Sequence, residues 1–273
     1  MAFYEQVLTP DEINRIERIQ LDDLGFGYDQ FGANRDTLFN TYAVVKSFYE
    51  KYFRVESFGH EHLPTQGRAI LAANHSGTLP LDGMMIGIDC FTQLEPPRLM
   101  RAVVDRFAAS LPYVGTFLSR CGQVIGSRRN FKELLESEQM VVVFPEGARA
   151  LGKNFSKRYQ LYPFNMGFVE LSLTYKAPIV PVAVVGAEEQ MPVWADIKPL
   201  AKALGFPYVP VTLPIPLPTH YRIYYGEPVH YYREFAEDTV QNPDMVRELA
   251  RDVQERVQQM LNRGLEEREG IFI

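Results

Sequence analysis

Apolar and polar residues follow two patterns along this chain, one typical of buried strands and one typical of helices. Short apolar runs such as RAILAA and MVVVF, bounded by polar or turn residues, predict strands. The predicted strands cover residues 54–58, 68–73, 98–104, 140–144, 179–185 and 221–225. Helical periods between them predict helices over residues 82–90, 107–118, 130–137 and 164–176. This alternation indicates an α/β fold with a mainly parallel central sheet flanked by helices.

The residues before this alternation predict an N-terminal helical segment. Thr9, Pro10 and Glu12 form the capping-box pattern of a helix over 9–20. After a glycine-rich loop, an apolar stripe rich in Phe and Tyr predicts a second, amphipathic helix over about 36–53. Basic residues lie beside its aromatic residues. This helix therefore either meets a membrane interface or packs on the core.

The segment 189–218 differs from the rest of the chain. It contains seven of the 19 prolines and the only Trp. Proline removes backbone donors, so this segment cannot be an inner strand, and it is too apolar for a solvated linker. We expect a flap that covers the core or faces lipid. An amphipathic helix over about 243–262 follows, so we divide the chain into an N-terminal segment, 1–53, and an α/β domain, 54–273, that includes the flap and this helix.

Charge and composition limit the kinds of ligand that the protein could bind and the cellular compartment in which it could work. The chain has 273 residues and a net charge of −6, yet residues 98–158 hold eleven Lys or Arg and only five Asp or Glu. This basic segment indicates either an anionic ligand or surface, or a solvated face that is basic by chance. Cys90 and Cys121 form no disulfide framework and predict reduced core residues on the cytoplasmic side. Neither a signal peptide nor a membrane span is expected, so membrane contact would be at the surface.

His75 is the most informative of the five histidines. It follows the predicted strand 68–73, and Asp82 comes seven positions later, beyond a Gly-Thr-Leu-Pro turn. An imidazole can take a proton from a hydroxyl, and a carboxylate can fix its tautomer. Alternatively, Asn74 caps the turn and His75 is a surface residue. His60 and His62 have a metal-like spacing without a third ligand nearby, so we expect loop residues and no metal site.

Three further motifs follow His75 in order. Gly122, Ile125 and Arg128 form Gly-x-x-Ile-x-x-Arg, with Asn130 as the expected cap of the next helix. The strand 140–144 then runs into Phe-Pro-Glu-Gly-Ala-Arg, which brings the Glu146 carboxylate, the Gly147 amide and the Arg149 cation together. The last motif is an apolar strand with Pro181 inside it, in the sequence Ile-Val-Pro-Val.

These motifs, in this order, resemble those of the glycerolipid acyltransferase family, the lysophosphatidate and glycerol-3-phosphate acyltransferases. The resemblance covers residues 55–190, and Phe-Pro-Glu-Gly after an apolar strand is its most specific part. Two departures stand out. Six residues separate His75 from Asp82 where the family has four, and Ala148 stands where Thr is common. The longer turn also resembles that of neutral-lipid and uncharacterised branches of the family.

The resemblance implies an O-acyltransferase that uses acyl-CoA or an acyl carrier protein as donor and needs no metal or bound cofactor. His75 would be the general base and Asp82 its orienting partner. Pro181 would help to wall the acyl pocket. Four residues would bind a phosphorylated acceptor and shape the site: Arg128, Glu146, Gly147 and Arg149.

The leading acceptor is lysophosphatidate or another lysophospholipid, in phospholipid biosynthesis or remodelling. A neutral lipid alcohol such as diacylglycerol is the alternative. A non-catalytic lipid or acyl-thioester binding protein and a thioesterase are the competing classes. We expect the enzyme to be a peripheral or monotopic protein on the cytoplasmic face of a membrane, touching it through 36–53 or the flap, with no nucleic acid partner.

Overall fold

A computed structural model describes residues 2–76, 79–147, 150–197, 199, 201 and 209–273. Among these residues, seven strands form the main sheet in the order β1-β9-β6-β2-β5-β3-β4. All neighbours are parallel except β6 and β9, which are antiparallel. The predicted α/β fold with a mainly parallel sheet is therefore confirmed. The strands are β1 (Glu56–Phe58), β2 (Ala69–Ala73), β3 (Met100–Val104), β4 (Val124–Ile125), β5 (Met140–Val143), β6 (Ile179–Val185) and β9 (Arg222–Tyr225).

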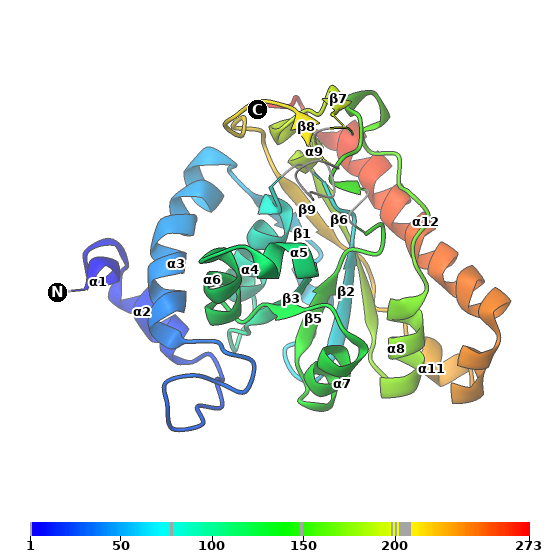
Figure 1. Ribbon diagram of the computed structural model, residues 1–273, viewed down its shortest axis with the longest axis horizontal. Coiled ribbons are helices and arrows are strands. Elements are labelled where there is room, and N and C mark those ends of the chain that lie inside the picture. Colours follow the sequence, from blue (N-terminus) through cyan, green and yellow to red (C-terminus); the bar gives the residue numbers. More distant parts are fainter. Residues whose placement is uncertain (1, 77–78, 148–149, 198, 200, 202–208) are drawn as a thin grey trace.

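Helices cover both faces of the sheet, with α8 and α12 on one side and α3 and α4 on the other (Figure 1). Side chains of β2 alternate between the two layers: Ile70 packs under the first and Leu71 under the second. Both faces are thus dry, which explains why the central strands read as continuous apolar runs. The helices of these layers are α3 (Arg35–Ser47), α4 (Leu81–Gln93), α7 (Arg128–Glu136), α8 (Gly167–Tyr175) and α12 (Pro243–Glu267).

Two helix predictions need correction. The predicted helix 107–118 is a hairpin of two short helices, α5 (Arg106–Ser110) and α6 (Val114–Arg120), because Pro112 lacks a backbone donor and Tyr113 has φ +64°. Helix α7 begins two residues earlier than predicted. Ser127 caps it by accepting a hydrogen bond from the Asn130 amide, so Asn130 is not the cap.

The N-terminal segment packs on the sheet domain. Thr9 and Glu12 make the predicted capping box at the start of α2 (Pro10–Glu17), after the short α1 (Phe3–Val7). The apolar face of α3 is buried against α2 and α4, and a π-helical turn, η1 (Phe48–Tyr52), continues it. Most of the predicted helix 36–53 therefore packs on the core and leaves Val44 and Phe48 exposed. The division at residue 53 stays a prediction.

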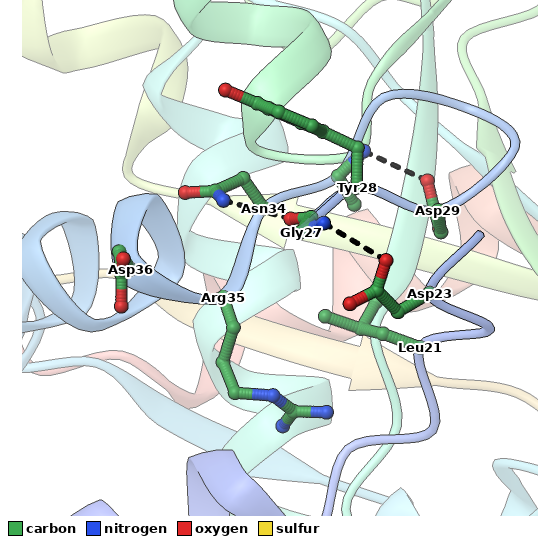
Figure 2. Close-up of a pocket in the computed structure, with 9 residues that line it drawn as sticks. Leu21, Asp23, Gly27, Tyr28, Asp29, Asn34, Arg35 and Asp36 are labelled. Atoms are coloured by element: carbon green, nitrogen blue, oxygen red, sulfur yellow. Dashed lines mark hydrogen bonds between the residues drawn. The ribbon is translucent and has the colours of Figure 1, made fainter. Parts of the chain in front are cut away.

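The loop between α2 and α3 is held by its own carboxylates. One oxygen of Asp23 accepts hydrogen bonds from the amides of residues 25–27. Figure 2 shows the bond from Gly27, together with the 2.8 Å bond that the Asn34 side chain donates to the Gly27 carbonyl. A hollow of about 250 Å³ lies here, and its lining contains neither His75 nor a residue of the sequence motifs. We regard this hollow as part of the loop's own packing.

The proline-rich flap forms a second, two-stranded sheet from β7 (Ala195–Asp196) and β8 (Pro210–Val211). Its first two residues, 189–190, end α9 (Ala187–Gln190), whose side chains are buried. Four apolar side chains of the flap are at least 40% exposed: Trp194, Ile197, Val211 and Ile215. The flap thus covers the core with its first residues and exposes apolar surface beyond them. After it come β9, α11 (Tyr231–Glu234) and α12.

The remaining short elements complete the chain. Residues 60–62 form a short 3₁₀ turn, η2 (His60–His62), and two more such turns are η4 (Phe155–Lys157) and η5 (Glu237–Gln241). Cys90 and Cys121 are buried free thiols, as predicted. No helix in the described ranges is long and apolar enough to cross a membrane.

A buried ion pair ties the N-terminal loop to the sheet. Arg101 on β3 is 1% exposed, pairs with Asp29, and donates to the Gly122 carbonyl at 3.3 Å. Gly122 has φ +81°, and a Cβ there would lie 2.5 Å from the Arg101 guanidinium. The glycine of the second motif is therefore required by this packing.

We predict that Asp29→Ala lowers the free energy of unfolding by about 3–5 kcal/mol, because it leaves the Arg101 charge buried and unpaired. Urea unfolding measures the loss. Adding Arg101→Met should restore most of it. Glu133→Ala, which removes the partner of the 85%-exposed Arg129, should cost at most about 1 kcal/mol. Equal losses for Asp29→Ala and Glu133→Ala would contradict the prediction.

Candidate active site

His75 lies at the edge of the sheet where β2, β5 and β6 end. Asn74, the residue before it, locks β2 onto β6: its side-chain oxygen accepts from the Val184 amide at 2.7 Å, and its side-chain nitrogen donates to the Val184 carbonyl at 3.1 Å. These bonds fix the backbone from which His75 projects. Functional residues of open α/β sheets gather at this carboxyl edge.

Asp82, in the first turn of α4, reaches the His75 imidazole. The distance from His75 Nδ1 to Asp82 Oδ2 is 2.8 Å. Since a carboxylate can only accept, Nδ1 carries the proton and Nε2 is left as the basic nitrogen. The amides of Ser76 and Gly83 also donate to Asp82, at 2.9 and 2.8 Å. His75 and Asp82 are therefore in contact although six residues separate them in the sequence.

Phe144 fixes the plane of the imidazole. Its ring stacks on that of His75 with a centroid distance of 4.0 Å and an angle of 23°. A Cβ at position 83 would lie 3.3 Å from the Phe144 ring, so Gly83 leaves the space that this stack needs. The first and third motifs therefore form one packed unit.

Glu146 points inward, where the resemblance implied contact with the acceptor. Its side chain is fully buried, and one oxygen accepts a hydrogen bond from the backbone amide of His75 at 3.2 Å. The other oxygen accepts from the Tyr162 amide at 2.7 Å. Glu146 thus holds the backbone of His75 in place.

Lys153 and Glu188 join the site, and our sequence reasoning missed both. The Lys153 ammonium lies 3.3 Å from Glu146 and 3.2 Å from Glu188, with all three side chains at most 5% exposed. Burial raises the pKa of Glu188 to about 7, although the Lys153 charge opposes this shift. Glu188 follows β6 at the same carboxyl edge as His75, a signal that could have found it. No sequence pattern singles out Lys153.

Arg128 stands apart from this buried cluster. Its guanidinium is 96% exposed and lies 3.7 Å from the Glu170 carboxylate of α8. Gly147 has φ +72°, and the space beside it is open. Arg149 lies outside the described residues.

A cavity of about 590 Å³ extends from Arg128 to Phe144, the residue that stacks on His75. Its polar lining includes Ser127, Arg128 and Glu170. Its apolar lining includes, besides Phe144 and Pro145, the side chains of Val103, Phe131, Val143, Phe168 and Leu171. The cavity therefore has one charged end and one apolar surface, and it reaches the outer side of the Phe144 ring.

The described residues contain no cluster of three potential ligands that could hold a metal ion. His62 is part of the 3₁₀ turn η2, and its Nδ1 bonds the Tyr225 carbonyl at 2.9 Å. The interpretation of His60 and His62 as loop residues fits this arrangement.

Comparison with known proteins agrees with these motifs. The family model described as Acyltransferase matches residues 54–185. An uncharacterized protein of Mycobacterium leprae is 38% identical over 257 residues, which span 89% of this chain and 69% of that protein. A similar protein of Mycobacterium tuberculosis is 36% identical over 260 residues, 90% of this chain and 72% of that protein.

Two relatives with informative names are more distant. A bovine DGAT1/2-independent enzyme synthesizing storage lipids is 24% identical over 198 residues, 71% of this chain and 56% of that enzyme. The crystal structure of the 1-acyl-sn-glycerophosphate acyltransferase from Thermotoga maritima shares the fold. Its TM-score is 0.57 at 17% identity, over 86% of this chain and 83% of that chain. The family model and the relatives that are 36–38% identical show that the chain belongs to the Acyltransferase family and is an acyltransferase.

Proposed function

We propose that this enzyme transfers a fatty acyl group from an acyl thioester, acyl-CoA or acyl carrier protein, to a hydroxyl of lysophosphatidate or another lysophospholipid. This would place it in phospholipid biosynthesis or remodelling. The observation that carries the proposal is the His75–Asp82 pair, whose imidazole stacks on Phe144, a lining residue of the cavity that has Arg128 at its charged end. A carboxylate-oriented imidazole suits proton removal from a hydroxyl.

The reaction needs only side chains and the two substrates. His75 Nε2 takes the hydroxyl proton as the acceptor oxygen attacks the thioester carbonyl. The buried Asp82 carboxylate stabilises the imidazolium that forms. The tetrahedral intermediate collapses, the carbon–sulfur bond breaks, and the imidazolium returns its proton to the leaving thiolate. The products are an ester and a free thiol, so this route requires no metal or bound cofactor.

The charged end of the cavity supports a phosphorylated acceptor. Arg128 opens α7, so its guanidinium and the positive end of the helix dipole face the same space as Ser127. A phosphate there would compete with Glu170 for Arg128. We keep Arg149 and the open backbone at Gly147 as further contacts with the acceptor. Acyl chains suit the apolar lining, while the wall role of Pro181 stays an expectation.

Diacylglycerol or another neutral lipid alcohol is the second candidate acceptor. The bovine relative is named for the synthesis of storage lipids, which favours this acceptor class. A neutral acceptor would not need Arg128. The two acceptor classes can therefore be separated by one substitution at the charged end of the cavity.

We also propose that the enzyme works as a peripheral protein at the cytoplasmic face of a membrane. The exposed apolar side chains of the flap, Trp194 and Ile215 among them, support contact with lipid. Because α3 buries most of its aromatic face, only its exposed Val44 and Phe48 could share that contact.

The first prediction concerns the base. His75→Ala should lower the rate of acyl transfer at least ~10²-fold, because general-base catalysis is worth about 10²–10⁴. Acyl-CoA and acyl carrier protein would each be offered with lysophosphatidate, lysophospholipids, glycerol 3-phosphate and diacylglycerol, and products read by lipid mass spectrometry. His60→Ala is the control, since that side chain is exposed. Transfer by His75→Ala at the wild-type rate would contradict the mechanism, and thiol release without a new ester would indicate a hydrolase.

The second prediction concerns the acceptor. Arg128→Ala should raise the KM for lysophosphatidate by about 10–100-fold, the worth of one charge-assisted contact, and leave the KM for a neutral acceptor unchanged. Its neighbour Arg129, which pairs with Glu133 on the surface, gives the matched control Arg129→Ala. An equal KM for lysophosphatidate in wild type and Arg128→Ala would overturn the phosphate role.

The third prediction concerns Lys153, which we propose positions His75 through Glu146. Lys153→Met removes the buried ammonium that lies between the Glu146 and Glu188 carboxylates, so we expect kcat to fall at least ~10-fold and the free energy of unfolding to fall by about 3–5 kcal/mol. KM should change little, because no substrate contact is lost. Lys153→Met with Glu188→Gln removes one of the repelling charges and should recover stability. Lys157→Met, on an exposed turn, is the control; full kcat in a folded Lys153→Met enzyme would refute the positioning role.

A further inference from the structure

The helical hairpin α5–α6, residues 106–120, carries apolar side chains into solvent. Tyr113 at its tip is 91% exposed and has φ +64°, a conformation that is unfavourable for a residue with a side chain. Val114 and Phe117 are also more than 40% exposed. Tyr113 directly precedes α6, and Val114 and Phe117 belong to the first turn of that helix. The hairpin therefore presents a small aromatic and aliphatic tip to its surroundings.

The hairpin is anchored at its base. The Arg120 carbonyl accepts a hydrogen bond from the Asn34 amide at 2.9 Å, and Cys121 contacts Thr41 of α3 at 3.4 Å. The two helices also pack tightly, since a Cβ on Gly115 would lie 2.0 Å from the Ala109 carbonyl. This anchoring holds the exposed tip in a fixed position instead of letting it fold onto the core.

The charge around the hairpin is one-sided. Residues 106–132 contain five basic residues and no Asp or Glu, in a chain whose net charge is −6. Arg106 and Arg120 are exposed at the two ends of the hairpin, and Arg128 follows shortly after. An element with exposed apolar side chains at its tip and basic residues at its two ends complements a surface that is apolar inside and anionic outside.

The hairpin also lies on the correct side of the molecule. It follows β3, which is two positions from β2 in the sheet order, and so it leaves the same carboxyl edge that holds His75. Ile125, in the neighbouring β4, adds a further exposed apolar side chain. Docking through this surface would bring the catalytic edge towards the lipid.

We propose that the α5–α6 hairpin docks the enzyme on an anionic lipid bilayer, with the tip formed by Tyr113, Val114 and Phe117 inserted among the headgroups. The proposal deepens the glycerolipid function proposed above and rests on it for its purpose. The flap differs because it carries no excess of basic residues. Dependence on anionic lipid therefore separates docking by the hairpin from docking by the flap.

The single Trp of the chain makes a direct test possible. In Trp194→Phe/Tyr113→Trp the only indole sits at the hairpin tip, and in the control Trp194→Phe/Phe26→Trp it sits in the N-terminal loop at an 84%-exposed position. Each double variant is mixed with vesicles of phosphatidylcholine alone and with vesicles that also contain phosphatidylglycerol. We expect a blue shift of the Tyr113→Trp emission with anionic vesicles, which is lost at about 1 M salt, where the Debye length is ~3 Å. The Phe26→Trp emission should not move.

Other results would overturn the proposal. A shift that is equal at both reporter positions, or that needs no anionic lipid, would contradict it. A shift of the native Trp194 without one at Tyr113→Trp would assign docking to the flap. A Tyr113→Trp shift without vesicles that grows with protein concentration would indicate a protein partner, a second copy of the chain.

A second variant tests the same surface by binding and activity. Phe117→Asp should reduce binding to anionic vesicles at least tenfold and slow transfer to acceptors presented in vesicles, while transfer to a short-chain, water-soluble acceptor stays unchanged. Unchanged vesicle binding would refute the proposal. Because vesicle binding needs no catalysis, His75→Ala should still bind. Binding by a wild-type enzyme that transfers no acyl group would refute the proposed function and leave the docking surface intact.

Discussion

The site depends on the position of β2, a strand buried on both faces and hydrogen-bonded on both edges. Residues 69–72 pair with β5 and residues 70–73 with β6, so β2 cannot slide without breaking two ladders. One residue beyond the strand, the Asn74 side chain makes two hydrogen bonds to the backbone of Val184 and so fixes the chain there as well. His75 then projects from a backbone that has almost no freedom, which is what a base must have if it is to meet a reacting hydroxyl within a few tenths of an ångström.

Charged side chains gather around His75 in a buried environment from which water is excluded. Asp82 and Glu146 each accept hydrogen bonds from backbone amides, which offset part of the cost of burying a carboxylate. Lys153 supplies the matching cation between Glu146 and Glu188. The result is a preorganised polar cluster that needs little rearrangement when a proton moves onto His75.

Local sequence predicted the regular elements where the signal is long. The strands buried on both faces and the amphipathic helices α3 and α12 follow directly from apolar periodicity. Short elements escaped, because the two residues of β4 cannot show a period. The prediction of one helix over residues 107–118 was wrong because apolar spacing continues across the break between α5 and α6. Pro112 was the signal against a continuous helix.

The sequence by itself determined the alternation of strands and helices and the family motifs, and it indicated His75 and Asp82 as candidate partners, whose contact the folded structure decided. That pair is separated by one turn, so its members could meet only in a limited set of ways. Tertiary structure alone decided that Glu146 faces the His75 amide and that Lys153 joins it to Glu188. These contacts bridge 71 and 35 residues of chain, and they arise because β6, β2 and β5 are neighbours in the sheet. Strand order results from the packing of the whole chain, and no local pattern of residues encodes it.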